Sequence, residues 1–365
     1  MSDNAKLLSR DEFGSQNDRK NNIKKFFANP MSSFIVTCGL LLFLQIIAIL
    51  GNETGIQIIK TSTMSALGIT LIYSMIAIGF CLLLGYSGLA SLGTAGFVGI
   101  GSYLAYFCFE AWGLPYFVCF FLTLVISVLI GLAVGFISLR IEGIYLAIIT
   151  LGLAEILRNA MQAIKATINI SLKNIKLFGV SVPKTVVFCL ITVTFLILVW
   201  VTSNLIRSPT GRAMLAMKNS TAAAQAYGIS LMKYRLMAFV ISTCYAAIAG
   251  IMYMMYIRSI STSMANIFKL ATSLNILAAV IIGGAKSIWG AVGGTVIIYG
   301  LDALVLQNIK FFRDNPTFIS IFIGILLIVV VMFYPGGIAQ AVLEIKIRIK
   351  AKIKAARAKK YGNDI

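Results

Sequence analysis

Long apolar runs constrain the fold of this chain more than any other feature of its sequence. Of its 365 residues, 59% are hydrophobic and only 12% are charged, whereas a soluble domain has about 25% charged residues. Several runs reach the roughly 18 to 20 apolar residues with which a helix crosses the hydrocarbon core of a membrane. The alternating pattern of a membrane barrel is missing, so helices are the remaining way to satisfy the backbone in lipid. The sequence therefore predicts an all-α polytopic membrane protein.

The apolar runs predict about ten transmembrane helices. The run at 89–109 is rich in glycine and the run at 271–283 is short, so either could be a broken or re-entrant helix that lines a cavity. The expected spans are 32–50, 64–84, 89–109, 116–138, 143–161, 185–206, 235–257, 271–283, 289–308 and 317–334. The expected domains are a polar tail over 1–30, a transmembrane domain over 31–338 with a loop at 207–235, and a basic tail over 339–365.

The positive charge sets the expected orientation. The formal net charge is +19, and the Lys and Arg residues gather outside the apolar runs. Because these residues mark cytoplasmic segments, both tails and the loop from Arg207 to Arg235 are expected in the cytoplasm, which ten crossings allow. The lysines from Lys165 to Lys184 depart from this rule, since the same plan places them outside. A cleaved signal peptide is not expected, because a polar segment of about thirty residues comes first.

The basic C-terminal tail has two interpretations. Its cations run from Lys346 to Lys360, and nucleic acid could bind such a cluster. No aromatic residues alternate with these cations, however, as binding to a single strand requires. The expected partner of the tail is therefore anionic membrane lipid, and no nucleic-acid partner is expected.

The residues of ordinary enzyme and metal sites are scarce. The chain has no histidine, which is the commonest metal ligand and general base. Its six cysteines all fall inside apolar runs without C-x-x-C spacing, and they are interpreted as small buried hydrophobes. We therefore expect no catalytic residues, no metal site and no enzymatic activity.

Two glycine-rich segments stand out within the apolar runs. They extend from Gly85 to Tyr103 and from Ile282 to Gly300. Small residues let membrane helices pack closely, but unwound glycine-rich backbone can also form a gate or line a path. The positions of the two segments would suit two inverted five-helix halves. The pathway candidates in them are Ser87, Gly88, Ser91, Gly93, Thr94, Gly96, Gly283 and Gly284.

Three ionisable residues fall inside apolar runs. Glu155 and Arg158 are three residues apart on one helix face, so they can pair with each other near the outer end of their span. Asp302 lies near the middle of its span without a partner in the same helix. Because a carboxylate in the membrane is costly, Asp302 is expected to face the bundle interior and is a further pathway candidate.

A basic, alanine-rich segment, "SPTGRAMLAMKNSTAAAQAYGIS", occupies 208–230 between two apolar runs. Pro209 and Gly228 bound a predicted helix from Gly211 to Tyr227. Met214, Met217, Ala224 and Tyr227 recur at near-helical spacing and form a modest apolar stripe. Such a helix could dock in the groove of another protein or lie on the bilayer, and periodicity and charge leave both alternatives open.

An ordered set of motifs resembles the permeases of branched-chain amino acid ABC transporters. The matching stretches are "GYSGLASLGTAGFVGIGSYLAYF", "GIYLAIITLGLAEILRN", "SPTGRAMLAMKNSTAAAQAYGISLMKYRLMAFVISTCYAAIAG", "SLNILAAVIIGGAKSIWGAVGGTVI" and "FYPGGI". The resemblance covers roughly Gly79 to Ile338 and implies a cytoplasmic coupling helix that docks on an ATPase. The residues that match the coupling motif are Gly211, Arg212, Ala213, Ala223, Ala224 and Gly228, whereas Thr221 and Gln225 stand where the family usually has acids.

The same resemblance implies the function and the partners. They are those of a permease subunit of an importer in the bacterial cell membrane, with both termini in the cytoplasm. Its expected partners are two ATP-binding cassette ATPase subunits, a second identical or related permease, an extracytoplasmic binding protein and membrane lipid. This chain has no G-x-x-x-x-G-K-[ST] loop, so ATP and Mg²⁺ are expected on the ATPase subunits and no cofactor on this chain.

The substrate implied by the resemblance is an amino acid, above all leucine, isoleucine or valine. Two departures from the family pattern bear on it: Thr94 replaces a usual histidine, and "TINISLKNIKLFG" replaces a glycine-rich stretch. Urea, a short amide or another small polar solute is the alternative within the same class. A stand-alone channel or an ion-coupled carrier, which could use Asp302, is the alternative from another class.

Overall fold

A computed structural model describes most of the hydrophobic part of the chain. The residues described are 34–39, 41–43, 45, 61–138, 144–165, 167–169, 176–177, 180–181, 183–261, 266–300, 317–334, 336–344 and 346. The chain divides into two units, Met1–Ile58 and Ile59–Ile365. In the first unit, residues 34–39 and 41–43 are helical; the elements below all belong to the second unit. The predicted N-terminal tail and most of the basic C-terminal tail lie outside the described residues.

Long apolar helices confirm an all-α polytopic membrane protein. Among the described residues, five helices are long and apolar enough to cross a membrane, or six if the bent pair Ile321–Phe333 and Gly337–Glu344 forms one span. The long helices are α3 (Thr61–Phe80, continued by the π-helix η1, Cys81–Tyr86), α5 (Tyr116–Ser138), α6 (Ile144–Ile164), α7 (Lys184–Arg207) and α10 (Leu231–Ile257). The prediction of ten spans in two inverted halves is not confirmed by these helices and stays a prediction.

Shorter helices occupy the remaining described apolar runs. They are α4 (Thr94–Tyr106, continued by η2, Phe107–Ala111), α11 (Leu270–Gly283), α12 (Ile288–Thr295, continued by η4, Val296–Gly300) and α15 (Thr317–Phe333). Helix α11 has 14 residues, which rise about 21 Å. Because the hydrocarbon core is about 30 Å thick, α11 alone is too short to cross it. A broken or re-entrant segment at 271–283 is the alternative that this length favours.

Helices α3 and α10 form the centre of the bundle, where most of their side chains are buried. Hydrogen bonds between side chains and between side chain and backbone link them to their neighbours. The Tyr256 hydroxyl of α10 donates to the Met64 carbonyl of α3 at 3.2 Å. The hydroxyls of Ser74 in α3 and Thr295 in α12 lie 2.7 Å apart. Such bonds satisfy polar groups that lipid could not hydrate, and they fix the register between helices.

Helix α5 shows how the sequence separates a protein-facing side from an outer side. Small residues such as Gly131 and Gly135 lie on its buried side, against Thr243 and Leu236 of α10. Large apolar side chains, including Phe121, are exposed on the other side. Small residues permit close helix packing, and an apolar outer side suits lipid tails.

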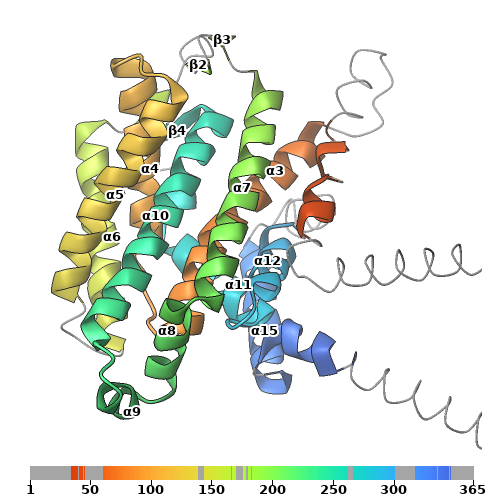
Figure 1. Ribbon diagram of the computed structural model, residues 1–365. Coiled ribbons are helices and arrows are strands. Elements are labelled where there is room, and N and C mark those ends of the chain that lie inside the picture. Colours follow the sequence, from red (N-terminus) through yellow and green to blue (C-terminus); the bar gives the residue numbers. More distant parts are fainter. Residues whose placement is uncertain are drawn as a thin grey trace, which may run out of the picture. The chain divides into compact units, whose positions relative to one another are not determined.

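Two short antiparallel strand pairs lie at the end of the bundle opposite α8 and α9 (Figure 1). They are β1 (Thr167–Asn169) with β4 (Ser259–Ser261), and β2 (Lys176–Leu177) with β3 (Val180–Ser181). The first pair places the C-terminal ends of α6 and α10 side by side. The expected topology places these two ends on the same side of the membrane, as observed here; that this side faces outside stays a prediction. Lys165, the first lysine that departs from the charge rule, donates to the Tyr106 hydroxyl.

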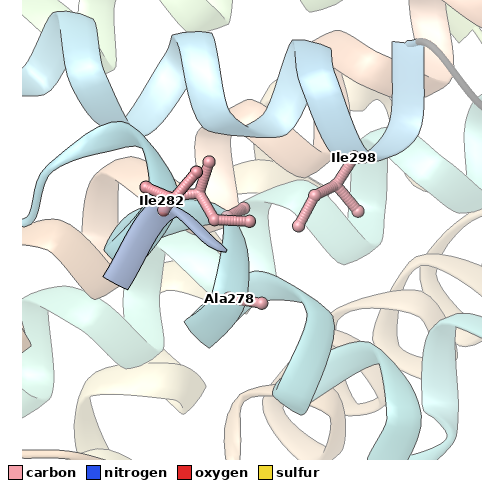
Figure 2. Packing of buried hydrophobic residues seen from close by; sticks show 5 residues of the cluster. Ala278, Ile282 and Ile298 are labelled. Carbon is pink, nitrogen blue, oxygen red and sulfur yellow. The ribbon is translucent and has the colours of Figure 1, made fainter. Parts of the chain in front are cut away.

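An apolar cluster packs α11 and η4 against α15 (Figure 2). Its buried members are Ala278, Ala279, Ile282, Ile298 and Val330. The backbones approach closely here, because a Cβ atom at Gly294 would lie 1.9 Å from the Ala279 carbonyl oxygen. The second glycine-rich segment therefore serves helix packing, which is one of its two predicted roles.

Candidate functional site

The segment between α7 and α10 forms two short helices, α8 (Pro209–Asn219) and α9 (Thr221–Ala226), at one end of the bundle (Figure 1). Ser208 caps α8, since its hydroxyl oxygen accepts from the Gly211 N–H at 3.3 Å, and Pro209 follows it as the first helical residue. Ser220 caps α9 by accepting from the Ala223 N–H at 3.2 Å. The prediction of one continuous helix from Gly211 to Tyr227 is wrong, because the backbone of Ser220 is extended and starts a second helix.

One side of this α8–α9 segment faces the bundle. Met214, Met217 and Ala224 are buried, as the apolar stripe predicts. Tyr227, assigned to the same stripe, is 87% exposed, because the break at Ser220 changes the direction of the stripe and Tyr227 follows the last residue of α9. Gly211 is buried at the α7–α8 junction, where a Cβ atom would lie 2.5 Å from the carbonyl oxygens of both Leu205 and Ile206.

The other side of the α8–α9 segment is exposed. Of the residues assigned to ATPase coupling, Gly211 and Ala224 are buried and Ala213 is partly buried. The exposed ones are Arg212, Thr221, Ala223, Gln225 and Gly228. No Asp or Glu lies anywhere between Ser208 and Ser230. The exposed side is therefore cationic or neutral, and Thr221 and Gln225 stand on it.

Lys218 ties α8 to the end of η1. Its ammonium donates to the carbonyl oxygens of Leu84 at 3.0 Å and Gly85 at 2.8 Å. A cation at the C-terminal end of a helix satisfies carbonyls that have no helical partner and interacts favourably with the helix dipole. Burial, and secondarily the charge of Lys286, lower the pKa of Lys218. This role of Lys218 cannot be predicted from the local sequence, because its partners lie more than 130 residues earlier in the chain.

Helix η1 also contacts the turn between α11 and α12. Tyr86 donates to the Lys286 carbonyl at 3.1 Å, and Cys81 donates to the Ala285 carbonyl at 3.0 Å. A Cβ atom at Gly85 would lie 1.8 Å from the Ala285 carbonyl oxygen, so only glycine fits this contact. Gly284, with φ 108°, reverses the chain in a conformation that favours glycine. A continuous set of contacts thus runs from α8 through η1 to α11 and α12.

The pathway candidates of the first glycine-rich segment include three residues with side-chain hydroxyl groups. Ser87, Ser91 and Thr94 are buried, and each hydroxyl has a partner within the protein: the Leu83 carbonyl, the Gly93 N–H and the Ser273 hydroxyl. The space beside Ser91 and Thr94 leaves no room for a water molecule. The side chains around Ser91 and Thr94 are therefore tightly packed, and a role of these residues in a pathway stays a prediction.

The glycine candidates make close contacts. A Cβ atom at Gly93 or Gly96 would meet α6 within 3 Å, and one at Gly283 would lie 1.8 Å from the Gly290 carbonyl oxygen. Gly88 has φ 75° and packs on the Lys218 side chain. These contacts show that the glycines allow close packing, and a role in gating stays a prediction. Asp302 lies outside the described residues.

Helix α6 carries the predicted ion pair of Glu155 and Arg158. The Arg158 Nε atom donates to both carboxylate oxygens of Glu155 at 3.1 Å, and Nη2 donates to one of them. Glu155 also lines a cavity of about 310 Å³. Among the residues described, no group of three or more Cys, Asp or Glu side chains is placed to hold a metal ion.

Comparison with known proteins connects this architecture to transport. Residues 62–331 match the family model described as "Branched-chain amino acid transport system / permease component". The chain is 28% identical to the high-affinity branched-chain amino acid transport system permease protein LivM of Salmonella typhimurium, over 80% of this chain and 72% of that protein. It is 26% identical to LivM of Escherichia coli, over 77% of this chain and 70% of that protein. No solved structure matches the chain.

Proposed function

We propose that this chain, which belongs to the family of permease components of branched-chain amino acid transport systems, is the membrane-spanning subunit of an ATP-driven importer for leucine, isoleucine and valine. The permease class follows from the family and from the apolar helices. The observation that supports an ATP-driven mechanism is the capped α8–α9 segment. One side of it packs on the bundle, and the other side is exposed. Rigidly held helices with a free outer side suit docking to a partner protein.

The proposed partners are two ATPase subunits at the α8–α9 segment, a second permease beside this chain, and a binding protein at the end that carries the strand pairs. ATP and Mg²⁺ belong to the ATPase subunits in this proposal. The membrane is the bacterial cell membrane, with the α8–α9 segment and both termini on the cytoplasmic side. The expected charge distribution supports this orientation, since the loop from Arg207 to Arg235 holds five Lys and Arg residues and no acids.

The contacts of Lys218 support a mechanical link in this importer. Movement of the ATPase subunits would shift α8, and Lys218 would transmit that shift to the end of η1. Cys81, Gly85 and Tyr86 contact the turn at Ala285 and Lys286, so α11 and α12 would move with η1. Packed elements with a few discrete arrangements can carry such coupling between distant sites.

The substrate is tested on the binding protein that accompanies this permease. We expect leucine, isoleucine and valine to raise its melting temperature by several degrees, because a ligand that binds only the folded state stabilises it by about 2.7 kcal/mol at a hundredfold excess over Kd. Urea and acetamide serve as the matched neutral probes. If urea raises the melting temperature and the three amino acids do not, the substrate assignment is wrong although the permease class stands.

A further inference from the structure

A cavity of about 310 Å³ lies where α4, α6 and the start of α11 meet. It is lined by Ala95, Leu151, Ala154, Glu155, Phe268 and Leu270. This volume is at the lower end of the range of about 300–1,000 Å³ that holds small-molecule ligands, so it suits a ligand with few atoms. Five of the six lining residues are apolar, and the sixth is a carboxylate.

The carboxylate that lines the cavity belongs to an ion pair that remains accessible. Glu155 accepts from Arg158 through both of its oxygens, yet its side chain stays 47% exposed. The pair lies within the apolar span Tyr145–Ile164, whose other exposed side chains include Ile148 and Ile156. Because charges inside a membrane are costly, they almost always face a partner or a water-filled path rather than lipid.

Two helix starts border the same cavity. Ala95 is the second residue of α4 and Leu270 is the first residue of α11. These first turns lie side by side, since the Ser273 hydroxyl accepts from the Ala95 N–H at 3.1 Å and from the Thr94 hydroxyl at 3.0 Å. The N-terminal ends of helices carry partial positive charge. The cavity therefore combines a carboxylate, a guanidinium beside it and two positive helix ends with apolar walls.

We propose that this cavity receives the transported amino acid as a zwitterion on its way through the permease. The ammonium group of the substrate binds the Glu155 carboxylate. Its carboxylate binds the Arg158 guanidinium and faces the helix starts, and its branched side chain packs on Leu151, Phe268 and Leu270. The proposal rests on the proposed function and names the site that would serve it. A neutral solute such as urea carries no charges to share this ion pair, so the site distinguishes the two substrate classes.

The site is tested by photolabelling. The complete transporter, reconstituted in lipid nanodiscs without ATP, is irradiated with a diazirine analogue of leucine, and the labelled residues are identified by mass spectrometry. We expect label on Leu151, Phe268 or Leu270, with excess leucine suppressing it. Isopentylamine, which lacks the carboxylate, and 4-methylpentanoate, which lacks the ammonium group, should not suppress it. Label elsewhere in the chain, or suppression by urea at the same concentration, overturns the proposal.

Substitutions of the ion pair separate a binding role from a structural one. In E155Q and R158Q, we expect labelling to fall about tenfold or more, because each loses a bond to a charged group. The melting temperature of the complex should stay as in the unchanged transporter. If melting temperature and labelling fall together, or if labelling does not fall, the pair is structural and the proposal is wrong.

The outcome is distinguishable from a failure of the proposed function, because labelling needs no ATP. Label in the cavity without ATP-driven uptake would contradict the importer and leave the site standing. ATP-driven leucine uptake without label in the cavity would contradict the site and leave the importer standing.

Discussion

Arg212→Glu should leave the chain in the membrane at its normal level and remove most of its association with the ATPase subunits. Arg212 is exposed in the first turns of α8, where an acidic side chain is better placed than a basic one with respect to the helix dipole. The substitution should therefore not unfold α8, and any loss comes from the docking side. A reversed charge opposite a complementary partner costs several kcal/mol, so we expect association to fall more than about tenfold.

The measurement is co-purification of the ATPase subunits with the tagged permease, together with leucine uptake. Lys233→Glu is the matched control, because Lys233 is also exposed near the α8–α9 segment and the substitution changes the net charge equally. Gly211→Asp is a poorer test, since Gly211 is buried against the backbone of Leu205 and Ile206 and an aspartate would distort the α7–α8 junction. Normal association and uptake in Arg212→Glu would refute docking at this side.

Lys218→Met should separate ATP hydrolysis from transport. The methionine has a similar length but cannot donate to the Leu84 and Gly85 carbonyls, and each bond to a charged donor contributes about 1.5–3 kcal/mol. Lys218 is partly buried, whereas the exposed side of the segment stays unchanged. We therefore expect normal ATPase association and continued hydrolysis, with leucine uptake lowered about tenfold or more.

Hydrolysis and uptake are measured on the same proteoliposomes for Lys218→Met and for Lys233→Met, the exposed control. The link through η1 is supported if Lys218→Met loses uptake but keeps hydrolysis, and if Lys233→Met loses neither. Unchanged uptake in Lys218→Met, or an equal loss in the control, would contradict it.

In the α8–α9 segment, the features that depend on residues close together in the chain could be predicted from the sequence. Pro209 and the spacing of Met214 and Met217 act within one helix, so a start of α8 near Pro209 and its buried side follow from the sequence. Ser220, which caps α9, lies in an alanine-rich run whose spacing predicts a continuous helix, so the break that leaves Tyr227 exposed is not predicted. The pattern that indicates a new helix start at this point is a serine followed by a threonine and three alanines, because serine is a preferred N-cap residue.

Contacts between distant segments could not be predicted in the same way. The sequence suggests that glycines pack backbones together, but it does not say that Gly85 meets Ala285 or that Lys218 reaches η1. The Glu155–Arg158 pair was predicted correctly because its partners are one turn apart. The cavity beside it depends on Ala95, Phe268 and Leu270, which come from segments far apart in the chain.

ATP-driven uptake of radiolabelled leucine tests the central claim most directly. The permease, its ATPase subunits and its partner permease are reconstituted in proteoliposomes, with ATP on the side of the α8–α9 segment and the binding protein on the opposite side. We predict that leucine accumulates only when ATP, the ATPase subunits and the binding protein are all present. Leucine uptake by this chain alone, at the same rate with and without ATP, would contradict the account and identify a channel or a carrier instead.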